Sequence, residues 1–147
     1  MYKKIGLSVL MFGLMIGLQS PAFADDSSYK PGTVWNFSTI KTEPGQFENY
    51  LDWLDDKWKK EQELMKKEGY VVSYHVLNVN NAREGEGDLI LAVEYRDYLT
   101  NAQREAIQKK VEAMFAADSH KMEAQSGDRK VMRKLGGSME LQELTLK

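Results

Sequence analysis

The sequence predicts an α+β domain that combines a four-stranded antiparallel sheet with two helices. Four short stretches show the alternation typical of strands, and two longer ones show the three-and-four spacing typical of helices. They follow one another in the order strand, helix, strand, strand, helix, strand. The chain contains no cysteine, so its stability has to come from a hydrophobic core and not from disulfides.

The first half of the domain is predicted to contain two strands and the longer helix. Residues 34–41 are rich in β-branched and aromatic side chains that alternate with polar ones, which indicates a strand. Residues 42–45 offer a cap and a first-turn proline for a helix over 47–67, which Gly69 ends. Residues 70–79 are apolar on both faces, as in a central strand. The apolar stripe of the helix consists of Phe47, Leu51, Leu54, Trp58 and Met65.

The second half is predicted to contain the remaining strands and the second helix. A polar hairpin loop over 80–87 leads into a strand over 89–95 with one strongly apolar face. Thr100 and Gln103 fit a capping box that opens a helix running to about Ala117.

The stretch before the last strand is predicted to end in a short basic helix over 128–135. Val131 and Leu135 are its expected inward residues, and the glycines at 136–137 are expected to end it. Residues 138–146 alternate as a final strand, and a change of phase between Leu141 and Leu144 suggests a bulge.

Residues 1–24 have the three parts of a cleavable secretion signal. Lys3 and Lys4 precede an apolar run over 5–18, and Ala22-Phe23-Ala24 provides a small-residue cleavage site. The run is shorter than the roughly 20 residues that cross a bilayer. We therefore expect an exported protein, periplasmic in preference to extracellular, with a flexible leader over 25–32 and a single domain over 33–147.

The charge of the mature chain argues against several classes of partner. Removal of Lys3 and Lys4 from the 20 basic residues leaves 18 against 22 acidic ones, a net charge of about −4. Nucleic acid and, after signal cleavage, membranes are not expected partners. His75 and His120 are the only histidines and form no ligand-spaced cluster, so no metal site is expected. Outside the cytoplasm nicotinamide, flavin and ATP are scarce, so no cofactor is expected either.

The predicted element order implies a ferredoxin-like sheet with both helices on one face. In either orientation of the central strand, its second face still carries apolar side chains such as Leu77 or Val76. A second subunit laid sheet to sheet would cover them, which predicts a homodimer.

This chain resembles the dimeric α+β barrel superfamily over nearly all of 34–146. The resemblance lies in the element order, in the long helix after Pro44-Gly45, and in the strand pair over 73–77 and 88–95. Its members include cofactor-free monooxygenases, haem-handling enzymes, small-molecule isomerases and decarboxylases, and proteins of unassigned role. The resemblance implies a fold and a dimer, whereas function has to come from the site.

A first candidate site lies on the predicted sheet. His75 shares a strand face with Ser73, and Glu94 joins them if the apolar face of its own strand points to the helices. An imidazole with a carboxylate could act as general base and orienting group, although a hydrogen-bond network between strands is the simpler interpretation. Further candidates for ligand contact are Asn36, Ser38, Ser73 and Tyr74.

A second set of candidates is aromatic or basic. Trp53 and Tyr50 lie beside the apolar stripe of the long helix and are candidates for an aromatic pocket, with core packing or dimer contact as the simpler interpretation. The basic run with Arg129 and Arg133 is interpreted as a solvated helix face, with an anionic ligand or an acidic partner helix as alternatives.

Three hypotheses of function remain open on the sequence. The first is an exported homodimer that binds a small apolar or aromatic molecule without transforming it. The second is a cofactor-free monooxygenase-like or related enzyme that uses His75, supported by Glu94 and Asn36. The third is a purely structural dimer.

Overall fold

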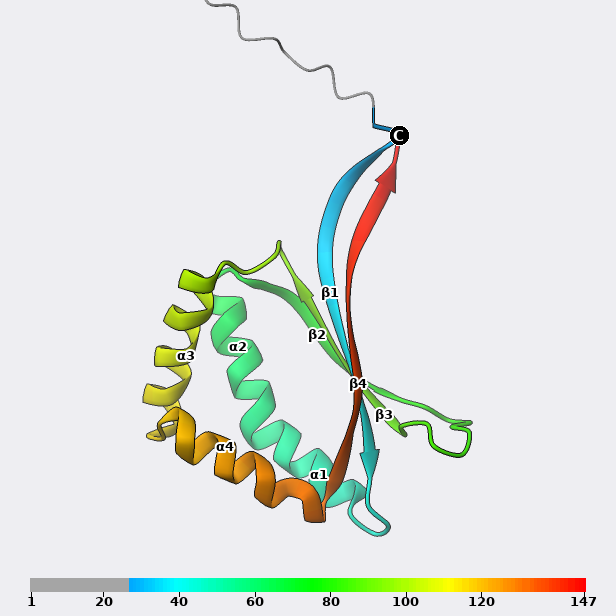
Figure 1. Cartoon of the computed structure of the whole chain (residues 1–147), viewed down its shortest axis with the longest axis vertical. Helices are drawn as coiled ribbons and strands as arrows, with labels where there is room; N and C mark the ends of the chain where they lie inside the picture. The colour runs from blue at the N-terminus through cyan, green and yellow to red at the C-terminus, as the bar shows by residue number, and fades with distance from the viewer. Residues whose placement is uncertain (1–26) are drawn as a thin grey trace, which may run out of the picture.

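A computed structural model describes residues 27–147 and confirms the α+β class. Its sheet has four antiparallel strands in the spatial order β2-β3-β1-β4, which is the ferredoxin-like order for this succession of elements. The strand over 70–79, expected to be central, is therefore an edge strand that pairs only with β3 within the described residues. The helices cover one face of the sheet, and β1 and β4 extend beyond the other two strands as a two-stranded ribbon (Figure 1). The strands are β1 (Tyr29–Thr42), β2 (Val71–Asn78), β3 (Leu89–Tyr95) and β4 (Arg133–Leu146).

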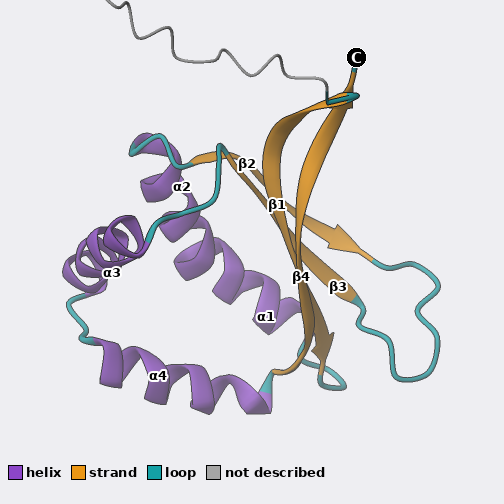
Figure 2. Cartoon of the chain, turned by 45° about the horizontal axis from the view of Figure 1, so that its top comes forward, coloured by secondary structure: helices purple, strands orange, loops and turns teal. Residues whose placement is uncertain are grey.

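The helical layer consists of one long helix and two shorter ones (Figure 2). The long helix is continuous and has three parts: α1 (Phe47–Trp53), a π-helical turn η1 (Leu54–Trp58) and α2 (Lys59–Lys67). The predicted capping box is present at Thr100 and opens α3 (Asn101–Phe115). Then follow α4 (Ser119–Asp128) and a 3₁₀ turn, η2 (Arg129–Val131). None of these helices, within residues 27–147, is long and apolar enough to cross a membrane.

The core lies between the sheet and the helices in two clusters of buried side chains. Burial of each large aliphatic side chain contributes about 1.5–3 kcal/mol, so these clusters fix the helices on the sheet. Leu89, Leu91 and Val93 all point from β3 into this core, as the alternation of the strand predicted. The first cluster consists of Ile40, Tyr50, Leu54, Leu89 and Leu91, and the second of Met65, Val71, Val93, Ile107 and Val111.

The strand pair β1–β4 begins earlier in the chain than predicted. β1 starts at Tyr29, so residues 29–32, expected in the flexible leader over 25–32, belong to the sheet and the domain begins before 33. They are ordered because Tyr29 pairs with Leu146 and Pro31 with Leu144, and a register shift follows between Pro31 and Val34. The predicted signal over 1–24 and residues 25–26 lie outside the described part of the chain.

The predicted basic helix over 128–135 is wrong. α4 ends at Asp128, and β4 already begins at Arg133. Val131 and Leu135, the expected inward residues, are each 64% exposed. Gly136 lies inside β4 and ends no helix. A Cβ at this position would lie only 3.0 Å from the carbonyl oxygen of Thr39, so glycine permits the close approach of β4 to β1.

Candidate functional site

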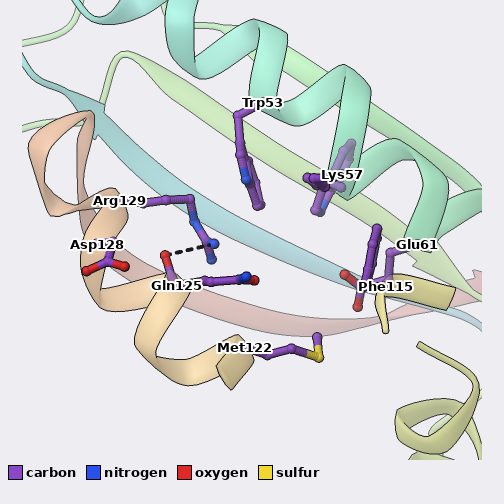
Figure 3. Close-up of a pocket in the computed structure, with 9 residues that line it drawn as sticks. Trp53, Lys57, Glu61, Phe115, Met122, Gln125, Asp128 and Arg129 are labelled. Atoms are coloured by element: carbon purple, nitrogen blue, oxygen red, sulfur yellow. Dashed lines mark hydrogen bonds between the residues drawn. The ribbon is translucent and has the colours of Figure 1, made fainter. Parts of the chain in front are cut away.

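A cavity of about 290 Å³ opens between the long helix and the segment that runs from the end of α3 through α4 to η2. We call it the interhelix cavity; Figure 3 shows the side chains that point into it from both sides. Its wall combines three aromatic rings and a thioether with a few charged or amide groups, the usual composition of a small-molecule site. The lining residues are Trp53, Lys57, Trp58, Glu61, Phe115, Met122, Gln125, Asp128 and Arg129.

The π-helical turn of the long helix helps to shape one wall of this cavity. In an α-helix, residues five apart diverge around the axis, whereas an i→i+5 turn aligns them more closely. The turn over Leu54–Trp58 thus allows Trp53 and Trp58 to line the same cavity, while Leu54 stays buried in the core. π-turns within α-helices frequently occur at functional sites.

Four cationic and aromatic groups follow one another from the cavity wall into the core. The Arg129 guanidinium lies over the Trp53 ring, 4.1 Å from its centroid. The Trp53 ring stacks on Tyr50 with centroids 5.8 Å apart and planes inclined by 9°. The Arg133 guanidinium lies 5.9 Å from the Tyr50 centroid on the core side. We call Arg133, Tyr50, Trp53 and Arg129 the cation–aromatic ladder; it holds the planar Arg129 guanidinium at the cavity wall.

The charged groups of the cavity are unequally solvated. Burial raises the pKa of Glu61, and the Arg129 charge only partly opposes this effect. Burial, followed by repulsion from Arg133, lowers the pKa of Arg129. Lys57 lies at the exposed rim, where its ammonium is 2.9 Å from Asp56 and 5.6 Å from the Phe115 centroid. The cavity therefore contains a half-buried carboxyl and a half-buried guanidinium, which favour opposite kinds of ligand group.

The structure divides the site residues predicted from the sequence among three places. Trp53 lines the interhelix cavity. Asn36 and Ser38 lie on the helix-facing side of β1, where the Ser38 hydroxyl donates to Asn36 Oδ1 at 3.2 Å. Tyr74, on the same side of β2, donates to Glu63 at 2.5 Å, and this bond raises the pKa of Tyr74 to about 12. These four residues are not brought together around one cavity.

The residues proposed for catalysis lie on the opposite face of the sheet. Ser73 is paired with Glu94 across the strands, and its hydroxyl donates to the Glu94 carboxylate at 2.7 Å. His75 is paired with Ala92; its exposed ring stacks on Trp35 with centroids 6.4 Å apart. None of them lines the interhelix cavity. The geometry places a hydrogen-bonded pair and a stacked imidazole on an open surface.

This open sheet face carries large apolar side chains on β1, β2 and β4. The Trp35 and Phe37 rings stack on each other along β1, with centroids 5.8 Å apart. Leu141 and Met139 lie directly opposite them on β4 and are 48% and 60% exposed. Leu77 continues the surface on β2 and is 44% exposed. We call this surface the open sheet face; its large exposed side chains exceed what a solvated face usually carries.

Most of the cavity residues were not identified from the sequence. Arg129 belonged to a basic run interpreted as a solvated helix face, yet it is half-buried, and Arg133 is only 7% exposed. Phe115 was not among the candidates. The sequence did contain one signal for this site, the i, i+4 spacing of the two arginines. Such a spacing places two side chains on the same side of a segment if that segment is helical, and the local structure was not known from the sequence. Among residues 27–147, no group of three or more histidine, aspartate or glutamate side chains could hold a metal ion.

Comparisons with known proteins add little to this geometry. No family model matches the sequence, and no curated protein matches it. The chain is similar to the crystal structure of PA3566 from Pseudomonas aeruginosa, with a TM-score of 0.41 and 15% sequence identity over 79% of this chain and 96% of that chain. A likeness at this level carries no argument about function, which therefore has to come from the site.

Proposed function

We propose that the chain is an exported, homodimeric protein of the dimeric α+β barrel superfamily that binds a small apolar or aromatic molecule in the interhelix cavity. The observation that carries this proposal is the cavity itself, walled by Trp53, Trp58, Phe115 and Met122. Aromatic and thioether side chains offer contact area and polarisable surface to a planar ligand. His75 is exposed on the other face of the sheet and does not line this cavity, so a binding role is favoured over an enzyme that uses His75.

The volume of the cavity limits the size of its ligand. At about 30 Å³ for each water-sized group, 290 Å³ corresponds to roughly ten non-hydrogen atoms. For a ligand of this size we expect a Kd between about 1 mM and 1 μM, since each atom contributes a fraction of 1 kcal/mol up to ~1 kcal/mol. A substituted single aromatic ring fits these limits.

The three tryptophans of the chain provide a test with an internal control. Trp53 and Trp58 line the cavity, whereas Trp35 lies on the open sheet face. Their indole N–H signals can be assigned in a ¹⁵N-correlated NMR spectrum by replacing each with phenylalanine. Titration with phenylacetamide and phenylacetate is expected to shift the Trp53 and Trp58 signals and to leave the Trp35 signal in place.

Two outcomes of this titration would count against the proposal. If neither compound moves the Trp53 and Trp58 signals, the cavity does not bind small aromatic molecules. If all three signals move together, binding is non-specific. The variant Phe115→Ala removes one wall and is expected to weaken binding several-fold, whereas Met114→Ala, at an exposed neighbour on α3, is a matched control.

The homodimer is proposed from the open sheet face. Burying Trp35, Phe37 and Leu141 against the same residues of a second copy would form an isologous interface. Light scattering of the mature protein at micromolar concentration is expected to give twice the mass of one chain. A monomer at that concentration would contradict the proposal. In the proposed dimer, the Ser73–Glu94 hydrogen bond would lie at the interface and would not be part of an active site.

Export is proposed from the pattern over 1–24. The intact mass of protein recovered from the periplasmic fraction is expected to correspond to a chain beginning at Asp25. Recovery of the full-length mass from the cytoplasm would contradict it.

A further inference from the structure

The two arginines of the cation–aromatic ladder are buried or half-buried, and neither has a carboxylate at ion-pair distance among residues 27–147. Arg133 is 7% exposed; its guanidinium donates to the Ser126 hydroxyl at 3.4 Å and lies beside the Tyr50 side chain. Arg129 donates from Nη1 to the backbone carbonyl oxygen of Gln125 at 3.1 Å (Figure 3). In both residues Nε is buried and has no hydrogen-bond partner among residues 27–147. The Trp53 ring faces the Arg129 guanidinium, and the Tyr50 side chain lies beside that of Arg133, so aromatic contacts offset part of the cost of desolvating both charges.

Neither arginine takes part in an ion pair within residues 27–147, although the protein forms such pairs at other places. In each of those pairs at least one side chain is 48% exposed or more, and an ion pair at an exposed position contributes little. Buried cations are ordinarily paired because an isolated charge in a poorly solvated site is costly. A site with two half-buried or buried guanidiniums and no carboxylate in contact lacks one negative charge.

Two carboxyl groups line the same cavity, but neither forms an ion pair with Arg129 or Arg133 among residues 27–147. Glu61 is half-buried, and burial favours its neutral form. Asp128 lines the cavity from the end of α4 and points away from the Arg129 guanidinium (Figure 3). Their presence also limits the ligand, since a doubly charged anion such as phosphate would be repelled more strongly than a monovalent carboxylate.

We infer that the ligand of the interhelix cavity is an aromatic monocarboxylate, whose ring packs against Phe115 and Trp58 and whose carboxylate accepts hydrogen bonds from Arg129. This inference rests on the proposed function, because it identifies the class of molecule that the cavity binds. The ladder fixes the guanidinium plane through Trp53, and a fixed guanidinium edge is suited to two parallel bonds to one carboxylate. Arg133 acts from behind the wall as a positioning residue that holds Tyr50 and adds positive potential.

A matched pair of ligands tests the inference on the mature wild-type chain. Phenylacetate and phenylacetamide have the same size and shape and differ in charge. From the usual strength of a charge-assisted hydrogen bond, we expect phenylacetate to bind at least about tenfold more tightly, measured from the Trp53 and Trp58 indole signals. Inorganic phosphate is expected not to displace it.

Variants identify the group responsible. Arg129→Gln is expected to reduce the preference for phenylacetate to within about twofold of phenylacetamide, because the charge-assisted bonds are lost. Lys130→Gln removes the same charge from an exposed neighbour and is expected to keep the preference. Arg129→Lys keeps the charge without the planar guanidinium and is expected to give an intermediate preference for phenylacetate. It provides the test if Arg129→Gln does not fold.

The outcomes separate this inference from the proposed function. Equal affinity of the wild type for both ligands would overturn the carboxylate inference and leave small-molecule binding intact. Absence of binding by either ligand would refute the proposed function itself. Displacement of phenylacetate by phosphate would show a general anion site and would also overturn the inference. The inference would likewise be overturned if Arg129→Gln left the preference for phenylacetate over phenylacetamide unchanged.

Discussion

The stacking of Arg129 on Trp53 should be measurable as a coupling free energy between the two residues. We consider a double-mutant cycle of Trp53→Leu and Arg129→Gln. Leucine retains apolar volume but has no π-face, and glutamine retains much of the side-chain length but has no charge. The cycle therefore isolates the guanidinium–indole contact, whose 4.1 Å separation is short for such a pair.

The expected magnitudes follow from the geometry. A half-buried guanidinium over an indole contributes about 1 kcal/mol, between the ~0.5 kcal/mol of exposed pairs and the ~2 kcal/mol of desolvated ones. Trp53→Leu also removes the stack on Tyr50, a further ~0.5–1.5 kcal/mol. We therefore expect Trp53→Leu alone to lower the free energy of unfolding by about 2 kcal/mol, and the cycle to give a coupling of about 1 kcal/mol.

Urea unfolding at one fixed protein concentration measures both quantities, because the midpoint multiplied by the urea dependence gives the free energy. The control cycle pairs Trp53→Leu with Lys130→Gln, whose side chain is exposed. Its coupling should be zero within about 0.5 kcal/mol. If the Arg129 cycle gives no more coupling than this control, the ladder does not hold the guanidinium, and the carboxylate inference loses its structural support.

Three further predictions concern the sheet, the open sheet face and the cavity acid. Asp88→Ala should lower the free energy of unfolding by about 3 kcal/mol, because the Asp88 carboxylate accepts from the backbone N–H of buried Thr42 at 2.9 Å and from its hydroxyl at 2.6 Å. A loss below about 1 kcal/mol would be inconsistent with these two hydrogen bonds. Leu141→Glu should give a monomer in light scattering, whereas Met114→Glu on α3 should leave the dimer intact; a dimer in both would remove the open sheet face as the interface. Burial raises the pKa of Glu61 above its ordinary value of 4.5, so protonation of Glu61 stabilises the folded state. This contribution is fully present below pH 4.5 and is lost as the pH rises through the raised pKa of the folded state. Glu61→Gln should flatten the fall in unfolding free energy over that pH window, and an unchanged slope would contradict the assignment.

Local patterns were sufficient to predict most of the fold. The polarity alternation of β3, the three-and-four spacing of the long helix and the Thr100 capping box each depend on a few neighbouring residues, and the structure confirms all three. The element order then restricts the arrangement to very few topologies. The open sheet face followed from the same argument, since two helices cannot cover both faces of a sheet.

The segment around η2 shows where local patterns fail. Val131 and Leu135 have the spacing of a helical apolar stripe, which led to the wrong helix and the wrong inward residues. The structure turns Arg129 and Arg133 inward instead, because Trp53 and Tyr50 offer them aromatic faces from another helix. Those faces are about 80 residues away in the chain, and no short-range pattern reports them.

The cavity could not be predicted for the same reason. Its walls come from α1, η1, α2, α3, α4 and η2, and the packing angles of these elements decide whether their side chains enclose a space. The sequence identified Trp53 as a candidate for an aromatic pocket but interpreted the groups around it as core or solvated surface. The phase of β1 relative to β2 was also undetermined, so Asn36 and His75 were grouped although they lie on opposite faces.

Native mass spectrometry of the mature protein, purified from its own compartment, tests the binding role most directly. It reports the number of subunits and any retained small molecule in one spectrum. We expect a dimer that carries one aromatic acid of roughly ten non-hydrogen atoms per chain, a limit set by the 290 Å³ cavity. A bare chain mass that stays unchanged after phenylacetate and phenylacetamide are each added in excess would contradict the account.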